Sequence, residues 1–178
     1  MSYTLIQTVT LTSNQASISF NSIPATFDDL KLVFSARGTI TDTQDVFLQF
    51  NGDTAGNYSF RRLFGTGSAV ASDSVANAAT AFRVGRSAGT NRTASTFSNC
   101  EVYIPNYRST VAKSASSDQV DENNATEAFQ LMTACLYNGT SAITSIVMQT
   151  LGGSNFATGT SASLYGITRG SSGGVVVS

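Results

Sequence analysis

Hydrophobic residues alternate with hydroxyl-bearing residues along much of this chain, and this period of two constrains the fold more than any other feature. Near the amino terminus, Tyr3, Leu5, Val9 and Leu11 are separated by threonines and other residues. Successive side chains of a strand point to opposite faces, so the alternation predicts strands with one buried face. The segments with this pattern, or with short β-forming apolar runs, are 3–11, 18–20, 30–37, 46–50, 58–64, 81–84, 100–104, 129–137, 143–151 and 163–167.

Turn-forming dipeptides separate several of these segments. Asn51-Gly52, followed closely by Gly56, predicts a β-hairpin between 46–50 and 58–64, because Asn-Gly favours the turns that join paired strands. Further turns are expected at 138–139 and 152–153.

Two long stretches carry little hydrophobic pattern. Residues 65–99 and 109–124 are small and polar, and they predict surface loops around one short strand at 81–84. Segments 72–81 and 118–128 could each form a short turn of helix, but neither has an apolar stripe. We therefore expect almost no helix in this protein.

These patterns predict an all-β fold, an antiparallel β-sandwich of jelly-roll type with about eight to ten strands and long polar loops. A length of 178 residues fits one domain with its own core. Residues 1–168 are expected to form the sandwich, and residues 169–178 a Gly/Ser connector with a Val-rich arm.

The charge balance argues against several classes of partner. Charged residues make up 12% of the chain and the formal net charge is -1, so no basic surface is expected. We predict neither a nucleic-acid partner nor a membrane partner. No signal peptide is expected, because the amino terminus carries no basic region followed by an apolar run, and no transmembrane helix is expected, because no apolar stretch is long enough to span a bilayer. Synthesis in a cytoplasm, followed by release through lysis or within a particle, is expected.

The residue types argue against catalysis. The chain contains no His, which is the commonest general base and metal ligand. Neither a nucleophile–base pair nor a cluster of metal ligands is visible in the sequence. We therefore predict that the protein is not an enzyme, with no catalytic, cofactor-binding or metal-binding residues.

The two cysteines, Cys100 and Cys135, each lie in a segment expected to be a strand. They are expected to be buried, reduced thiols that pack as small hydrophobic groups. The alternative is a cross-strand disulfide formed after release from the cell.

Two groups of oxygen-bearing side chains could suggest a site. Asn51, Asp53 and Asn57 share one loop, but they offer a single carboxylate, whereas Ca²⁺ takes six to eight oxygens and favours several carboxylates. We expect these residues to serve the turn. Asp28 and Asp29 are adjacent, so on a strand they would point to opposite faces, and a turn and strand-start role is expected.

Other charged residues gather in two regions. The acidic stretch, formed by Asp118, Asp121, Glu122 and Glu127, is expected to be a solvated edge. The arginines would either bind carboxylates of a neighbouring subunit or serve solubility on exposed loops, and these alternatives stay open. The arginines concerned are Arg61, Arg62, Arg83, Arg86 and Arg92.

The carboxy-terminal ten residues combine a flexible connector with three consecutive valines at 175–177. Valine strongly favours strands, and an exposed valine run tends to pair with another strand. We hypothesise that 175–177 add as a strand to a neighbouring subunit or to the protein beneath. The alternative is a strand that folds back on its own sheet.

Several segments together resemble a family of small structural proteins of tailed bacteriophages, and their order and spacing carry the resemblance. They are IPATFDDLKLVFSAR at 23–37, FNGD at 50–53 with NYS at 57–59, IPNYRS at 104–109, AITSI at 142–146, NF at 155–156, GT at 159–160 and LYGI at 164–167. The resemblance implies a β-sandwich protein of the virion that oligomerises, often as a homotrimer. Its location in the particle is left open.

Two functions follow as expectations from the resemblance. The first is a capsid decoration (cement) protein that binds the major capsid protein or other virion proteins and stabilises the head shell. The second is a tail-fibre or baseplate component that binds host surface carbohydrate. For the second, Tyr58, Tyr103 and Tyr107 could supply an exposed aromatic cluster. Either way the protein would be made in the host cytoplasm and would reside in the virion.

Overall fold

The computed structural model describes residues 1–178 except for 125–127, 151, 153 and 171–178. The described part contains twelve β-strands and no α-helix. The strands are β1 (Ser2–Thr10), β2 (Ser17–Phe20), β3 (Asp29–Ala36), β4 (Gln44–Phe50), β5 (Tyr58–Gly65), β6 (Val70–Ala79), β7 (Phe82–Ser87), β8 (Ser98–Ile104), β9 (Lys113–Asp121), β10 (Phe129–Tyr137), β11 (Ile146–Thr150) and β12 (Ser161–Thr168).

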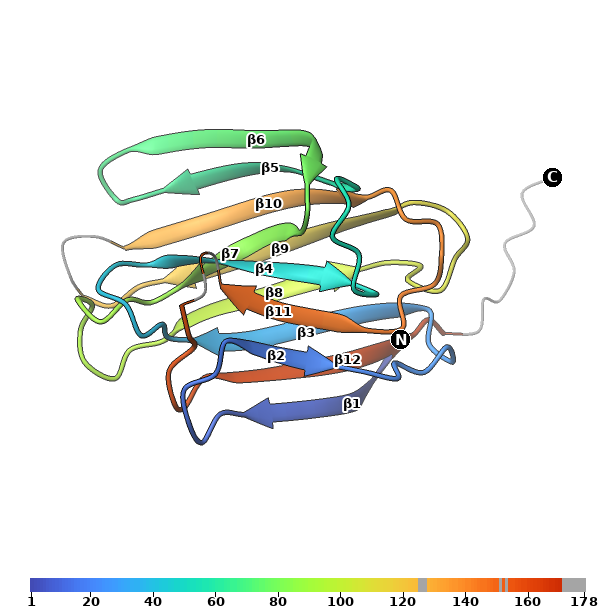
Figure 1. Ribbon diagram of the computed structural model, residues 1–178, viewed down its shortest axis with the longest axis horizontal. Coiled ribbons are helices and arrows are strands. Elements are labelled where there is room, and N and C mark those ends of the chain that lie inside the picture. Colours follow the sequence, from blue (N-terminus) through green and yellow to red (C-terminus); the bar gives the residue numbers. More distant parts are fainter. Residues whose placement is uncertain (125–127, 151, 153, 171–178) are drawn as a thin grey trace.

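The strands form two antiparallel sheets. The large sheet has the order β1-β12-β3-β8-β9-β10-β5-β6, and the small sheet has the order β2-β11-β4-β7. In Figure 1 the small sheet lies in front of the middle of the large sheet, while β1, β5 and β6 project beyond it. The small sheet therefore covers only the central strands of one face of the large sheet.

The core lies between the two sheets and ends in a group of four aromatic rings. Phe50 of β4 meets Phe82 of β7 edge to face, with ring centroids 5.0 Å apart. Tyr58 of β5 and Tyr137 of β10 stack with centroids 4.8 Å apart. Such pairs contribute about 0.5–1.5 kcal/mol beyond the burial of their area, so this group ties the two sheets together.

The predicted fold class is confirmed, because the chain is an all-β, antiparallel, two-sheet sandwich. The predicted jelly-roll type is not confirmed. A double-sheet jelly roll has eight strands, whereas this chain places eight strands in one sheet and four in the other.

Two strands lie where the sequence predicts loops. β6 occupies part of 65–99, and β9 occupies part of 109–124, so both loop predictions are wrong for these parts. The possible helical turns are wrong as well: most of 72–81 belongs to β6, and 118–121 belongs to β9.

β9 has a strand's alternation, but polar residues occupy its inward positions. Lys113 is buried and donates to the carbonyl oxygens of Gly139 and Ser141, at 3.1 and 2.6 Å. Ser117, also buried, donates to the carbonyl oxygen of Val84 at 2.7 Å. Hydrogen bonds thus satisfy these two side chains on an inward face that hydrophobic periodicity could not identify.

The predicted hairpin at Asn51-Gly52 is wrong. Both residues have positive φ, 54° and 67°, as a tight turn of this type requires. However, β4 pairs with β7 and β11 of the small sheet, while β5 pairs with β6 and β10 of the large sheet. The turn therefore carries the chain from one sheet to the other.

β1 does not have the buried face that its alternation predicts. Tyr3 and Leu5 are more than half exposed, and Val9 is only partly buried. β1 is the outermost strand of the large sheet, beyond the area that the small sheet covers (Figure 1), and its pairing with β12 shifts register near Ile6. An edge position, which local pattern does not reveal, explains the exposure.

Candidate interaction surface

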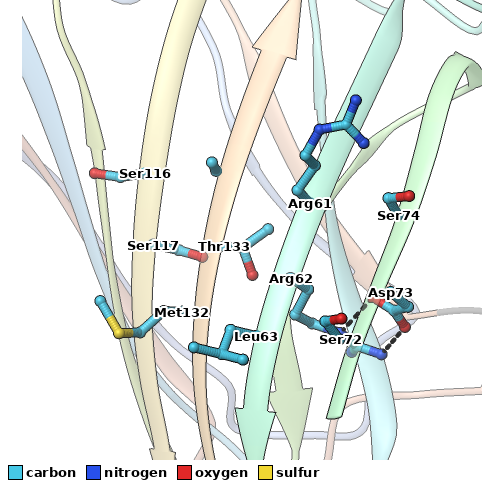
Figure 2. A pocket seen from close by; sticks show the side chains of 11 residues that line it. Arg61, Arg62, Leu63, Ser72, Asp73, Ser74, Ser116, Ser117, Met132 and Thr133 are labelled. Atoms are coloured by element: carbon cyan, nitrogen blue, oxygen red, sulfur yellow. Dashed lines mark hydrogen bonds and ion pairs between the residues drawn. The ribbon is translucent and has the colours of Figure 1, made fainter.

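Four strands contribute to an ion cluster inside the sandwich. Asp45 of β4 accepts from Arg62 of β5 at 3.1 Å, from Arg86 of β7 at 3.4 Å, and at short range from Arg83 of β7. Asp73 of β6 accepts from Arg62 at 2.5 Å and from Arg83 at 3.4 Å. Figure 2 shows the Arg62–Asp73 contact between β5 and β6. The cluster joins the projecting strands of the large sheet to the small sheet.

Aromatic faces enclose the arginines of this cluster. The guanidinium of Arg86 lies 4.3 Å from the ring centroid of Phe129, and that of Arg62 lies 4.9 Å from the centroid of Phe64. Burial lowers the pKa of Arg86, and the charge of Asp45 opposes the shift. The ring contacts and the carboxylates together compensate the desolvation of these cations.

The alternative that places the arginines on exposed loops is therefore wrong, because four of them lie in strands β5 and β7 and the fifth, Arg92, is buried. Arg62 and Arg92 are buried, and Arg83 and Arg86 are half-buried. Only Arg61 is exposed. Four of them bind carboxylates of this chain, Arg92 through Asp42 and the other three within the ion cluster, so the cluster is an internal tie between strands.

Asp28 and Asp29 stand at the start of β3, as expected, and both bind Arg169. Asp29 is buried and accepts from the Arg169 side chain, from the Tyr103 hydroxyl and from the backbone N–H of Asn106. Asp28 accepts from the backbone N–H of Arg169. Burial alone would raise the pKa of Asp29, but the hydrogen bonds outweigh it and hold the pKa below its ordinary value.

The loop after β4 uses its polar side chains within the fold, as the turn interpretation predicts. Asn51 accepts from the backbone N–H groups of Thr144 and Ser145, at 2.8 and 3.2 Å. Asp53 accepts from the Asn57 amide and, at 3.0 Å, from the hydroxyl of Tyr137. Among the described residues, no group of three or more His, Cys, Asp or Glu could hold a metal ion.

The acidic stretch is not uniformly solvated, so that prediction is wrong for Asp121. Asp118 and Glu122 are exposed, whereas Asp121 is buried at the end of β9. Burial raises the pKa of Asp121, and the positive charge of Arg92 opposes this. Glu127 lies outside the described residues.

The cysteines match their prediction. Cys100 and Cys135 are buried free thiols. Burial raises the pKa of Cys135 to about 12 and that of Cys100 well above its ordinary value, so both are protonated and unreactive at neutral pH.

The proposed tyrosine cluster does not exist as an exposed surface. Tyr58 and Tyr107 are fully buried, and only Tyr103 is partly exposed. Tyr107 reaches the carbonyl oxygen of Pro24, and Tyr58 contributes to the aromatic end of the core. An aromatic platform for a sugar is therefore absent at these three positions.

A different surface emerges on the face of the large sheet that points away from the small sheet. Over β9, β10, β5 and β6 this outer face carries mainly apolar and small side chains, and we call it the outer patch. Its two most prominent residues are Met132, which is 57% exposed, and Leu63, which is 51% exposed. Its outward residues are Leu63, Ser72, Ser74, Ser114, Ser116, Val120, Gln130, Met132, Ala134 and Leu136, with Arg61 and Asp118.

The outer patch is hollowed. A space of about 630 Å³ lies over it, bounded by Leu63 and Met132 and floored by small residues such as Ser74, Ser116 and Ala134. Figure 2 shows Leu63, Met132, Ser74 and Ser116 on four adjacent strands, with Arg61 at one side of the hollow. The hollow forms because the side chains of Ser and Ala are too small to fill the space between the larger outward residues.

One sequence signal could have identified the outer patch. β10 reads FQLMTACLY, so its outward positions include Met132, Ala134 and Leu136 while its inward positions are also largely apolar. A strand that is apolar on both faces is typical of a sheet covered on both sides. The small sheet covers one face of β10, and nothing in this chain's described part covers the other.

No described segment forms a helix long and apolar enough to cross a membrane.

Comparisons with known proteins found no relative of this chain. No protein-family model, curated protein or solved structure matches this chain.

Proposed function

We propose that this chain is a non-enzymatic structural protein of a tailed-phage virion, and that it acts as a capsid decoration (cement) protein. The single observation that carries the proposal is the outer patch, an exposed apolar face on a sandwich tied together by internal ion pairs. Contiguous exposed apolar surface is typical of protein–protein contact sites. The resemblance of the segments between 23 and 167 supplies the virion context.

The mechanism proposed is mass action. A protein that binds the assembled shell, but not its separated subunits, stabilises the shell by its free energy of binding. Buried apolar area at subunit contacts supplies most of that free energy. Partners are therefore other copies of this chain, in the homotrimer that the resemblance implies, and the major capsid protein or other virion proteins.

Electron microscopy of labelled particles tests this proposal. Purified virions are treated with antibody against the protein and imaged in negative stain, and mass spectrometry counts the protein in the same particles. Label distributed over the head is expected. Absence of the protein from mature particles would end the proposal.

The same images test the alternative, a tail-fibre or baseplate component that binds host carbohydrate. Label confined to the tail, together with binding of the isolated protein to a glycan array, would favour that role. The burial of Tyr58 and Tyr107 removes the aromatic cluster on which the alternative was based.

A further inference from the structure

The outer patch carries two opposite charges, one on each side of its central strand. In the register of the sheet, Arg61 of β5 lies beside Ala134 of β10, and Asp118 of β9 lies beside Met132 of β10. Both charged side chains are exposed. Within the described part of the chain, neither forms an ion pair or a side-chain hydrogen bond, in contrast to the clustered arginines behind them.

This arrangement is complementary to itself. Neighbouring strands lie about 4.8 Å apart, so β5 and β9 flank β10 symmetrically. A twofold axis that runs along β10 places β5 of one copy over β9 of the other. Arg61 of each copy then lies over Ser116 of the other, because both residues are level with Ala134. Asp118 stands two residues further along, about 7 Å away, within reach of an arginine side chain.

We infer that two copies of this chain bind face to face through the outer patch, about a twofold axis parallel to β10. Sheets that pack face to face lie about 10 Å apart, which brings Met132 and Leu136 of both copies together at the axis. The hollow over Ser116 and Ala134 receives Arg61 of the second copy, and its charge meets Asp118. Two equivalent ion pairs form, as an isologous contact requires.

We assign a second copy as the occupant because the charges of the patch are complementary to those of the same patch on another copy. It has one positive and one negative unpaired group at matching distances from the axis, and between them an uncharged strand that presents Met132, Ala134 and Leu136. Arg61 and its symmetry mate stand on opposite sides of the axis, so like charges do not meet. The inference names the partner of the surface on which the proposed function relies, but its test needs no virion.

A charge exchange tests the contact. The mass of the purified full chain is measured by light scattering and analytical ultracentrifugation, and an even number of copies of the 18.6 kDa chain is expected. Two copies satisfy the inference, and so do six, if twofold contacts join homotrimers in pairs. Arg61→Asp and Asp118→Arg each place like charges opposite one another, and each should weaken association about 10-fold or more. The double variant restores the opposite charges and should recover the wild-type dissociation constant within about 3-fold.

The control is Leu5→Asp, which adds a charge to an exposed apolar residue on β1, at the far edge of the same sheet. It should leave the mass unchanged. A wild-type monomer or an isolated trimer would overturn the inference, and so would single variants that associate normally or a double variant that does not recover. A monomer that loses particle binding on Arg61→Asp would assign the patch to the shell instead, leaving the proposed function intact.

Discussion

Asp45 and Asp29 are two carboxylates on which separate parts of the chain converge. Asp45 binds three arginines from β5 and β7, and Asp29 binds Arg169, Tyr103 and the backbone of Asn106. Each residue is polar and lies in or next to a strand, where hydrophobic pattern assigns no importance to it. Their effect on stability comes from the partners that the fold brings to them.

Replacing Asp45 with Asn should strongly destabilise the fold. The side chain of Asp45 is 12% exposed, and its loss as an anion leaves three arginines without their shared partner. Removing one member of a buried ion pair typically costs about 3–5 kcal/mol. Urea denaturation followed by fluorescence measures the change in the free energy of unfolding.

The control for Asp45 is Glu101→Gln. The Glu101 side chain is 56% exposed and pairs at 2.7 Å with Lys31, which is 24% exposed, and exposed pairs of this kind contribute about 0–1 kcal/mol. Equal effects of the two substitutions would show that the ion cluster does not tie the sheets.

Asp29 should make stability fall in acid. Its pKa in the folded protein lies below the ordinary 3.8, so the folded state binds protons less readily than the unfolded state. The resulting stabilisation is present above the ordinary pKa and is lost as the pH falls through the folded value. Thermal unfolding of the wild type and of Asp29→Asn between neutral pH and pH 2 measures this, and the difference between the two proteins should shrink below about pH 4. A constant difference would contradict the assignment.

At the scale of elements, close contacts between strands and loops decide which glycines can be replaced by a larger residue without destabilising the fold. The ring of Phe27, in the loop before β3, lies directly over Gly166 of β12. A Cβ on Gly166 would stand 2.1 Å from Cδ2 of that ring, far inside van der Waals contact. The glycine therefore permits the loop to close against the sheet.

Gly166→Ala should destabilise the protein by about 1–3 kcal/mol, because the ring of Phe27 must leave its place. Gly65→Ala is the matched control, since Gly65 also lies in a strand of the large sheet and a Cβ there meets nothing nearer than 4.0 Å. It should change the free energy of unfolding by no more than about 0.5 kcal/mol. Denaturant midpoints compare the two, and a neutral Gly166→Ala would rule out the contact.

At the scale of the whole molecule, the two sheets differ in size, and this difference exposes surface. The small sheet covers only the central strands of one face, so β1 projects beyond it, and on the opposite face the outer patch has no cover from the described part of this chain. Such surface fits a protein that works by holding neighbours. The charge exchange between Arg61 and Asp118 examines this at the level of assembly.

Two truncations separate the sandwich from its carboxy-terminal arm. The hypothesis that 175–177 pair with a neighbour concerns residues outside the described part. Ending the chain after Gly170 keeps Arg169 on Asp29, so the melting temperature should not change, while particle binding should weaken if the hypothesis holds. Ending it after Thr168 removes Arg169 and should lower the melting temperature. Unchanged particle binding after the first truncation would refute the strand-addition hypothesis.

The sequence by itself determined that this protein is a two-sheet β structure, and it identified ten of its twelve strands. Period-two alternation in segments such as 30–37 and 46–50 is a local property, and it predicts the buried face correctly where a second sheet covers the strand, which is not the case for β1. The burial of the Cys100 and Cys135 thiols was predictable for a similar reason, because each cysteine lies at an inward position of its own strand, β8 or β10.

Only the tertiary structure decided which strands share a sheet and which charges are buried. Asn51-Gly52 encodes a tight turn, but the distant partners of β4 and β5 place those strands in different sheets. Ser117 of β9 and Arg62 of the ion cluster are polar, and a hydrogen bond and ion pairs to remote segments compensate their burial. A local pattern cannot encode a partner that lies far away in sequence, and for that reason the ion cluster and the outer patch became visible only in the fold.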